Sequence, residues 1–354
     1  MDKKVLVAMS GGVDSSVAAK LLIDKGFDCV GATMKLFENE DAGIPRSHTC
    51  CSLDDVSDAR QVATRLGMNY YVFNFKEGFK ENVIDRFTSA YLNGFTPNPC
   101  IDCNRYMKFG KLFERADILG CKYIATGHYV RREETSDGFV LKKALDRSKD
   151  QSYVLFFLGQ EELSRLLFPL GELQKNETRR IAQESGFINA AKPDSQDICF
   201  VPDKKYANAI QRFAGIMPPS GDFIDKNGKI LGKHKGIAYY TIGQHKGLGI
   251  STADKMFVVS IDAKNNVVKL GTEDELFGTT LVAENFSFVS GKIPKGEFKC
   301  LAKIRYQQTE QPATAVASGT SVKIVFDEPQ RAITPGQFAV LYDGEVCLGG
   351  GEIV

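Results

Sequence analysis

The first two hundred residues alternate short apolar runs with helical stretches, and this alternation limits the possible folds more than any other feature. Strand-like runs occur at residues 4–9 (KVLVAM), 28–37, 70–75 and 122–129. Residues 17–26 and 54–67 have helical periodicity and end in a glycine, as helices commonly do. The pattern predicts an α/β fold in which helices cover both faces of a parallel sheet.

The chain has 354 residues, more than one hydrophobic core usually serves. After residue 204 the alternation gives way to strands and turns, with two-residue hairpin signals at Asn227–Gly228, Asn265–Asn266 and Asp343–Gly344. We therefore predict an α/β domain at 1–204, a small central β-rich domain at 205–280 and a C-terminal β-barrel at 281–354.

Composition sets few limits on function. The net charge of +1 neither requires nor excludes nucleic acid, so an RNA site must be a local basic surface. The apolar run near Met1 is too short for a signal peptide, and no stretch approaches the roughly 18 apolar residues of a membrane span. Nine dispersed cysteines indicate reduced thiols, so we expect a cytoplasmic protein without a membrane partner.

The stretch AMSGGVDSS, between the first strand and the first helix, has the composition of a phosphate-binding loop. Gly11 and Gly12 allow close approach of the backbone to an anion, and Ser10, Ser15 and Ser16 add hydroxyl donors. The loop lacks the Lys-Ser/Thr ending of a Walker loop, which argues against ordinary γ-phosphoryl transfer. A tight, well-capped strand-to-helix turn is the structural alternative.

These residues resemble the SGGxDSS motif of the N-type ATP pyrophosphatases, whose PP-loop domains are of the adenine nucleotide alpha hydrolase-like type. Such enzymes cleave ATP between the α and β phosphates with Mg²⁺ and attach AMP to a substrate oxygen. The resemblance implies that Asp14 helps to hold Mg²⁺ and that Met34 and Gly127 complete the nucleotide site. The implied ATP-binding residues are Ala8, Met9, Ser10, Gly11, Gly12, Val13, Asp14, Ser15, Met34 and Gly127.

Cys100 and Cys103 form a C-x-x-C pair that could belong to a metal site, a redox pair or neither. No second C-x-x-C accompanies them, so we predict no resident structural metal; the other candidate ligands are Cys50, Cys51, Cys121, Cys199 and His128. Small buried hydrophobic roles are expected for Cys29, Cys300 and Cys347.

Cys103 precedes a predicted helix with basic residues at spacings of three and four. A thiol at a helix start beside cations should have a depressed pKa and be nucleophilic. The stripe could contact phosphates or be a solvated face; it consists of Arg105, Lys108, Lys111 and Arg115. Cys199 lies near Asp194 and Asp197, whose charges would raise its pKa, so the residues alone predict a structural role.

The motifs SGGVDSS, TPNPC..CN...KF, TGHY, KDQSYVL, DSQDICF, YYTIGQHKGLG, RY and TPGQFAVLYDGEVCLGGG occur in the order found in tRNA-specific 2-thiouridylases. The resemblance spans nearly the whole chain and implies an adenylating domain, a small central domain and a C-terminal barrel that grip the tRNA anticodon arm. It also implies that ATP adenylates the uridine C2 oxygen before sulfur attack. Cys199 matches a persulfide-carrying cysteine and Cys103 its partner nucleophile, with a transient disulfide between them. A cysteine desulfurase or a sulfur-carrier protein would supply the sulfur.

The same resemblance implies positions that contact RNA. Asn98, Pro99 and Cys100 match the segment that touches the target base, and the other matching residues are His128, Lys149, Asp150, Gln151, Arg305, Tyr306 and Gln337. Two positions depart from the common pattern. Cys100 replaces a frequent Asp that is a candidate general acid/base, and His245 replaces a frequent Arg. The base role is therefore left open between Asp102, Cys100 and no side chain.

Two other functions fit part of the sequence. A metal or iron–sulfur dependent tRNA thiolase on the same fold would use Cys100, Cys103 and Cys199 as ligands. A non-catalytic RNA-binding protein would need neither the phosphate loop nor the cysteines. A PP-loop ligase acting on a small molecule is a further alternative.

Overall fold

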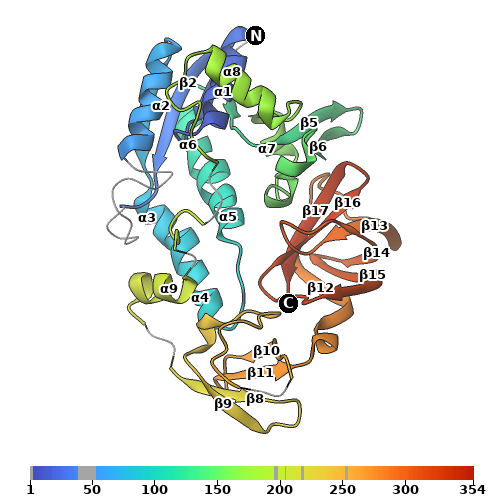
Figure 1. Cartoon of the computed structure of the whole chain (residues 1–354). Coiled ribbons are helices and arrows are strands. Elements are labelled where there is room, and N and C mark those ends of the chain that lie inside the picture. Colours follow the sequence, from blue (N-terminus) through green and yellow to red (C-terminus); the bar gives the residue numbers. More distant parts are fainter. Residues whose placement is uncertain (1–2, 39–52, 195–197, 204, 217–218, 252–253) are drawn as a thin grey trace.

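A computed structural model describes residues 3–38, 53–194, 198–203, 205–216, 219–251 and 254–354. Within these ranges the chain forms a parallel α/β unit, a small β-rich unit and a β-barrel (Figure 1). The small unit and the α/β unit lie at opposite ends of the molecule, with the barrel beside them. The predicted fold class is confirmed.

The α/β unit is built on a five-stranded parallel sheet with the order β3-β2-β1-β4-β7. Val5 lies opposite Cys29 on one neighbouring strand and Tyr123 on the other. The strands are β1 (Lys4–Ala8), β2 (Asp28–Lys35), β3 (Asn69–Asn74), β4 (Tyr123–Ala125) and β7 (Leu166–Leu167).

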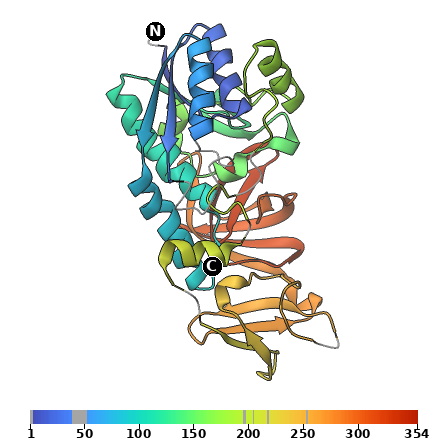
Figure 2. The same cartoon turned by 60° about the vertical axis from the view of Figure 1, so that its left-hand side comes forward.

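Successive side chains of β1 enter different cores on the two faces of this sheet. Val5 and Val7 pack with α1 (Val13–Asp24), α2 (Leu53–Arg65) and α8 (Lys175–Glu184), whereas Leu6 packs on the opposite face. Figure 2 shows the strands between the blue helices and the teal helical run. The sheet is therefore covered on both faces, as the strand composition predicts.

Two helical runs cover the second face. The first is α3 (Lys76–Phe79), the π-helix η1 (Lys80–Ile84) and α4 (Asp85–Leu92); the second is α5 (Pro99–Asp102), the π-helix η2 (Cys103–Lys111) and α6 (Leu112–Ile118). The remaining helices of this unit are η3 (Arg147–Lys149), η4 (Ser152–Val154) and α7 (Gln160–Arg165). No helix of the described residues is long and apolar enough to span a membrane.

The cations of the predicted basic stripe are divided between the π-helix η2 and α6, and residues three and four apart do not align on a π-helix as they do on an α-helix. Their side chains have separate partners, and Lys111 pairs with Glu114 over 3.0 Å. The Arg105 guanidinium lies 4.9 Å from the Phe157 ring centre, and that of Arg115 lies 5.6 Å from Phe73.

The helix α9 (Tyr206–Ala214) packs on α4 and its buried residues join the core of the α/β unit. The small unit that follows contains η5 (Ile237–Tyr239) and a four-stranded sheet with the order β10-β11-β8-β9. Its strands are β8 (Gly221–Ile224), β9 (Ile230–His234), β10 (Phe257–Asp262) and β11 (Val267–Gly271). Turns occur at the two places predicted in this unit, but they exceed two residues, whereas the predicted turn between β16 (Phe338–Asp343) and β17 (Val346–Ile353) has two. The Asp225 side chain accepts the N–H groups of Asn227 and Lys229, which makes a wider turn between β8 and β9.

The barrel begins after η6 (Glu273–Leu276) and closes where β12 pairs with both β15 and β17. Its antiparallel strands are β12 (Phe277–Phe288), β13 (Glu297–Lys303), β14 (Gln311–Ser318), β15 (Ser321–Arg331), β16 (Phe338–Asp343) and β17 (Val346–Ile353). The hairpin β5 (Val130–Thr135) and β6 (Gly138–Lys143) of the α/β unit joins this sheet, with Leu141 opposite Cys347.

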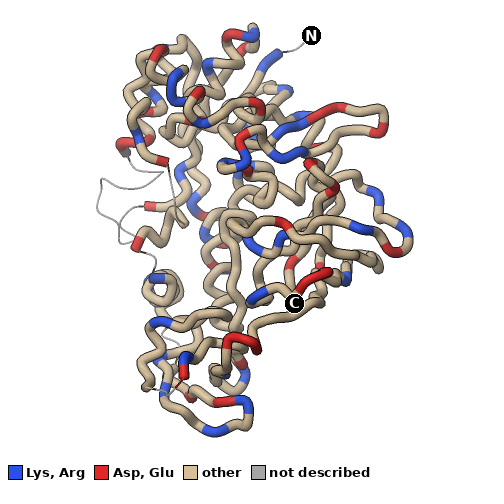
Figure 3. The backbone as a smooth tube through the Cα atoms, turned by 45° about the vertical axis from the view of Figure 1, so that its right-hand side comes forward, with Lys and Arg blue, Asp and Glu red and all other residues tan. Residues whose placement is uncertain are grey.

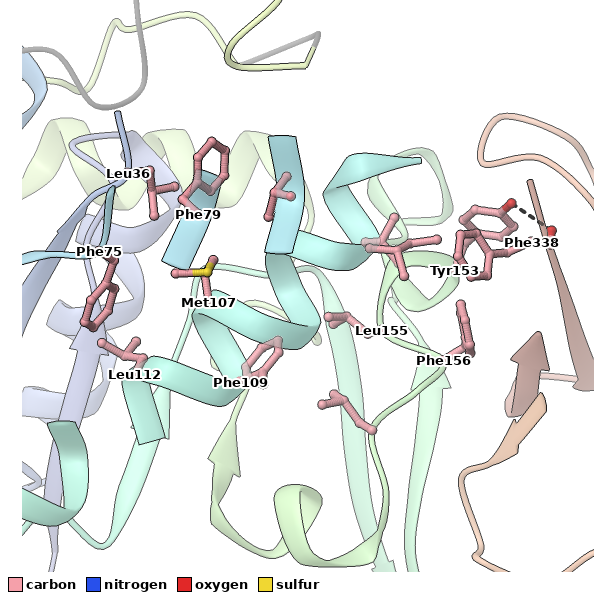
Figure 4. Close-up of a cluster of buried hydrophobic side chains, with 14 of the residues drawn as sticks. Leu36, Phe75, Phe79, Met107, Phe109, Leu112, Tyr153, Leu155, Phe156 and Phe338 are labelled. Atoms are coloured by element: carbon pink, nitrogen blue, oxygen red, sulfur yellow. Dashed lines mark hydrogen bonds between the residues drawn. The ribbon is translucent and has the colours of Figure 1, made fainter. Parts of the chain in front are cut away.

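One hydrophobic cluster runs from the sheet through both helical runs to the barrel (Figure 4). Tyr153 and Phe156 are fully buried between the α/β unit and the barrel. The Tyr153 hydroxyl donates to the Phe338 carbonyl over 2.9 Å, and the Phe156 and Phe338 rings lie 5.4 Å apart. The barrel is thus packed against the α/β unit through a continuous core.

Replacing Phe156 by Ala should lower the free energy of unfolding by about 3–5 kcal/mol, because it leaves a cavity where the α/β unit meets the barrel. Ile118→Ala is the control, since that side chain is 73% exposed and should change stability by less than about 0.5 kcal/mol. Urea unfolding followed by far-UV circular dichroism measures both. Equal unfolding midpoints for the two variants would contradict the packing role of Phe156.

Candidate active site

The loop between β1 and α1 has a conformation that requires glycine. Gly11 has a φ of 75°, and a Cβ there would lie 2.4 Å from the Asp55 carbonyl oxygen. The Ser15 hydroxyl donates to the Gly12 carbonyl over 3.2 Å and accepts the Ser10 N–H over 3.2 Å. The loop is therefore held in shape at a helix N-terminus, where anions bind favourably.

The other predicted nucleotide residues surround this loop. An added Cβ at Gly127 would lie 2.7 Å from the Ser15 nitrogen, so this glycine permits close packing against α1. Met34 is half-buried on β2, and Thr33 beside it donates its hydroxyl to the Met9 carbonyl over 2.6 Å. Ala8 ends β1, and the side chains buried beneath the loop are those of Met9 and Val13.

Asp14, the predicted Mg²⁺ ligand, is held by two side chains from distant elements. Lys175 donates to both of its carboxylate oxygens over 2.6 and 2.8 Å, and the Tyr129 hydroxyl donates over 2.9 Å. Burial and the Asp14 charge raise the pKa of Tyr129, so this phenol stays protonated as a donor.

Lys175 also reaches Asp194, which links the phosphate loop to the segment before Cys199. Its ammonium lies 2.9 Å from Asp194, and Lys149 and Arg179 each approach the same carboxylate to 2.8 Å. Although burial opposes the shift, hydrogen bonds from Lys149 and Lys175 lower the pKa of Asp194 to about 2. Asp194 is thus ionised and paired with cations.

Asn189 and Lys192 also contact the loop, and the sequence reasoning missed both. The Asn189 side-chain amide donates to the Gly11 carbonyl and to the Ser16 hydroxyl, each over 2.9 Å. Lys192 lies 3.4 Å from the same carbonyl and 2.5 Å from Asp55. The sequence signal for these two contacts is the large number of Lys and Arg residues between 175 and 192. This signal does not predict which distant residues they contact.

The cysteine turn, residues 98–103, begins a helical run. The Asn98 side chain caps it by accepting the Cys100 N–H over 3.2 Å, and buried Pro99 occupies the first helical position. Cys100 is exposed and Cys103 is partly buried.

The expectation of a depressed pKa for Cys103 is wrong. Burial raises the pKa of this thiol to about 11, and the opposing charge of Lys108 is too weak to compensate. Cys103 is preceded by the helical turn of α5, so it lies inside a helical run rather than at its positive end. The thiol is therefore protonated at neutral pH.

Cys199 borders the same hydrophobic cluster as Cys103. Phe200 anchors it, because its ring packs edge-to-face on Phe79 at 5.8 Å and on Phe87 at 5.2 Å. Both rings come from the helical run that contacts η2. The two cysteines are thus brought to one core, whereas Cys50, Cys51 and Asp197 lie outside the described residues.

Asp102, one alternative for a base, lines a cleft of about 840 Å³ between the three units. Its carboxylate lies 3.5 Å from the Arg86 guanidinium, and Glu352 of the barrel lines the same cleft. Burial raises the pKa of Asp102, while Arg86 partly opposes the shift.

The predicted RNA-contact stretch 149–151 makes internal hydrogen bonds. Asp150 accepts the Ala144 N–H over 3.0 Å and the Ser152 hydroxyl over 2.7 Å. The Gln151 side chain accepts the Tyr129 N–H over 2.9 Å. This stretch therefore connects the phosphate loop to the β5–β6 hairpin.

His128 is buried, with only 6% of its surface exposed. Its Nδ1 lies 2.8 Å from the Thr126 hydroxyl, and its ring packs near Phe109 and Phe168. Burial, together with the Lys108 charge, holds its pKa well below the usual value, so it is neutral.

The predicted barrel residues lie next to the cysteine turn. Gln337 donates to the Thr96 carbonyl over 2.7 Å, and Thr96 donates its N–H to the Pro335 carbonyl over 2.9 Å. The Tyr306 ring lies 6.0 Å from that of Tyr153.

Arg305 and His245 both have partners within the chain. Arg305 donates to the Ala332 carbonyl and lies 3.4 Å from the Thr334 hydroxyl, so part of its hydrogen-bonding capacity is used internally. His245 packs 5.4 Å from the Phe257 ring. Desolvation and the charge of Lys255 lower its pKa, so it carries no charge near pH 7.

Charge is interspersed over all three units rather than gathered on one (Figure 3). Among the described residues, no group of three or more His, Cys, Asp or Glu side chains is placed to hold a metal ion.

Three family models together cover most of the chain. Residues 3–203 match the tRNA methyl transferase HUP domain, 208–272 the tRNA methyl transferase PRC-barrel domain, and 278–353 the aminomethyltransferase beta-barrel domain. Among solved structures, a 4-thiouridine synthetase in complex with RNA and ATP is similar over 56% of this chain and 45% of that chain, with 19% identity and a TM-score of 0.38.

Curated relatives match over their full length. The tRNA-specific 2-thiouridylase MnmA of Clostridioides difficile is 48% identical over 100% of this chain and 98% of the relative. MnmA 1 of Thermoanaerobacter sp. is 50% identical over 99% and 98%, and MnmA of Clostridium acetobutylicum is 48% identical over the whole of both chains. The chain belongs to the tRNA-specific 2-thiouridylase family.

Proposed function

We propose that this chain catalyses ATP-dependent 2-thiolation of the wobble uridine of tRNA. The full-length match to tRNA-specific 2-thiouridylases carries the proposal. The phosphate loop and the placement of Cys103 and Cys199 on one core support it. The uridine C2 carbonyl is a poor electrophile, so its oxygen must be converted to a leaving group before sulfur can attack.

In the activation step, the backbone N–H groups of the loop and the N-terminus of α1 hold the pyrophosphate end of ATP. The uridine C2 oxygen attacks the α phosphate and pyrophosphate leaves. Asp14 suits Mg²⁺, because this ion commonly binds one carboxylate together with substrate phosphates. The buried Asn189 Oδ1 beside the loop has no partner among the described residues, as expected of a site built for a polar ligand. Bound Mg²⁺ would neutralise phosphate charge.

In the sulfur step, Cys199 carries a persulfide supplied by a cysteine desulfurase or a sulfur-carrier protein. Cys103 attacks the inner sulfur, which releases hydrosulfide and leaves a Cys103–Cys199 disulfide. Hydrosulfide then attacks C2 and AMP leaves with the original oxygen. Both thiols are partly buried against the same apolar cluster, which limits the access of water to the exchange.

The RNA-binding part of the proposal assigns the anticodon arm to the surface beside the cysteine turn. The barrel loop that holds Thr96 also carries Gln337, and Tyr306 lies on the same side. The target uridine leaves its stack to reach the loop. In this proposal residues 1–204 adenylate, 205–280 connect and 281–354 contact RNA, in a reducing cytoplasmic setting.

The first test is nucleoside mass spectrometry of unmodified tRNA incubated with the protein, Mg²⁺ and a sulfur donor, with and without ATP. We expect 2-thiouridine only with ATP. Absence of thiolated base from folded protein with several tRNAs would contradict the proposal. Stoichiometric iron in protein purified without oxygen would instead favour the iron–sulfur alternative.

Asp14→Asn should reduce tRNA-dependent pyrophosphate release by about 100-fold or more, because the loop loses the carboxylate that orders Lys175 and accepts Mg²⁺. Asp24→Asn is the matched control, since Asp24 pairs with Lys20 on the exposed side of the same helix. Pyrophosphate release assays measure both. Unchanged release by the Asp14 variant would remove Asp14 from the activation step.

Cys103→Ser and Cys199→Ser should each abolish 2-thiouridine formation while retaining tRNA-dependent AMP incorporation, because activation precedes sulfur transfer. Cys121→Ala, at a thiol buried in the core, serves as the control for the loss of one cysteine. Radiolabelled ATP and nucleoside analysis separate the two steps. Loss of AMP incorporation in either serine variant would overturn this order.

A further inference from the structure

Cys100 and Cys103 lie three residues apart in one helical turn. The Cys103 N–H donates to the carbonyls of Cys100 and Pro99, so the backbone is helical between the two cysteines. Residues three apart lie on the same face of a helix, with Cβ atoms about 5–6 Å apart, and the two thiols are close enough for Cys100 to affect the pKa of Cys103. The two thiols therefore share one side of the helix, at a separation from which small adjustments reach disulfide geometry.

The two thiols differ in their access to solvent. Cys100 is exposed, whereas Cys103 and Cys199 are both partly buried against the hydrophobic cluster. A disulfide between Cys103 and Cys199 would therefore form where a reductant, above all a protein, has poor access. A disulfide that included Cys100 would have one sulfur at the surface.

The surroundings hold this turn in place without covering Cys100. The Asn98 cap and buried Pro99 fix its start, and the barrel loop binds the preceding Thr96. Asp102, the only carboxylate of the C-x-x-C turn, is held by Arg86 at 3.5 Å. Its negative charge is thus partly neutralised rather than left beside the reacting sulfurs.

We propose that Cys100 is a resolving thiol, an assignment that rests on the function proposed above. After sulfur transfer, the Cys100 thiolate attacks the Cys103 sulfur of the Cys103–Cys199 disulfide. A Cys100–Cys103 bond forms, the Cys103–Cys199 bond breaks, and Cys199 leaves as a thiolate that can accept the next sulfur. An external dithiol then supplies two electrons and two protons to reduce the exposed Cys100–Cys103 disulfide.

The assignment accounts for a cysteine at the position where Asp is common in the family. A carboxylate there cannot take part in thiol exchange, so a chain with Asp must be reduced at the Cys103–Cys199 bond directly. With Cys100 present, the disulfide is transferred from the Cys103–Cys199 pair to the more exposed Cys100–Cys103 pair before an external dithiol reduces it. The substitution therefore changes how the enzyme is regenerated and leaves the sulfur-transfer step itself unaltered.

The test is a single turnover of full-length protein carrying a Cys199 persulfide, with ATP, Mg²⁺ and tRNA but no reductant. Acid quenching, alkylation and peptide mass spectrometry then identify the disulfide. Cys100 and Cys103 fall in one tryptic peptide, between Arg86 and Arg105, so their disulfide is an internal loss of two hydrogens. We expect this species and alkylated Cys199 in the wild type.

Cys100→Ser should instead accumulate the Cys103–Cys199 cross-link and turn over several-fold more slowly with a protein dithiol as reductant. Cys121→Ala should give the wild-type disulfide, and thermal unfolding checks that both variants are folded. A persistent Cys103–Cys199 cross-link with alkylated Cys100 in the wild type, alongside 2-thiouridine, would overturn the resolving role alone. If neither 2-thiouridine nor any disulfide formed in either protein, the result would contradict both the resolving role of Cys100 and the proposed function.

Discussion

Burial of the aromatic segment at residues 153–158 holds the two large parts of the molecule together. Tyr153, Phe156 and Leu158 are fully buried, and the Tyr153 hydroxyl donates to the Phe338 carbonyl of the barrel. Because the same core includes Met107 of η2, the barrel and the cysteine turn are positioned by one packing arrangement (Figure 4). Together with the pairing of β6 and β17, this core places the barrel loop where Gln337 contacts Thr96.

Local patterns in the sequence were sufficient to predict the parallel sheet and its helices, the phosphate loop and the approximate positions of the turns. Each depends on periodicity or on glycine at a defined place, which neighbouring residues determine. Three features depend on contacts distant in sequence and could not be read this way. These are the π-helical turn after Cys103, the pairing of Leu141 with Cys347, and the Lys175–Asp14 ion pair. The pKa of Cys103 was mispredicted for the same reason, since burial is a tertiary property.

The cations near the phosphate loop are already balanced by carboxylates. Lys175 pairs with Asp14 and Asp194, and Lys192 pairs with Asp55. Without these partners, several cations around one small loop would repel each other and destabilise the fold. Under the proposed function, this pairing favours ATP bound with Mg²⁺ over ATP alone. ATP would bring negative charge beside Asp14, and a divalent cation would remove the repulsion that Lys175 cannot neutralise by itself.

Burial of Cys103 lowers the reactivity of its thiol but also protects the thiol from oxidation. A low-pKa, exposed thiol reacts quickly but is also the first to be oxidised. With its pKa raised to about 11, Cys103 is mostly protonated and exchanges slowly in the resting chain. Under the proposed mechanism, this slow exchange would keep the persulfide sulfur on Cys199 until an activated uridine arrives. Exchange with an external dithiol would then fall to Cys100, which is exposed and lies one turn away on the same helical run.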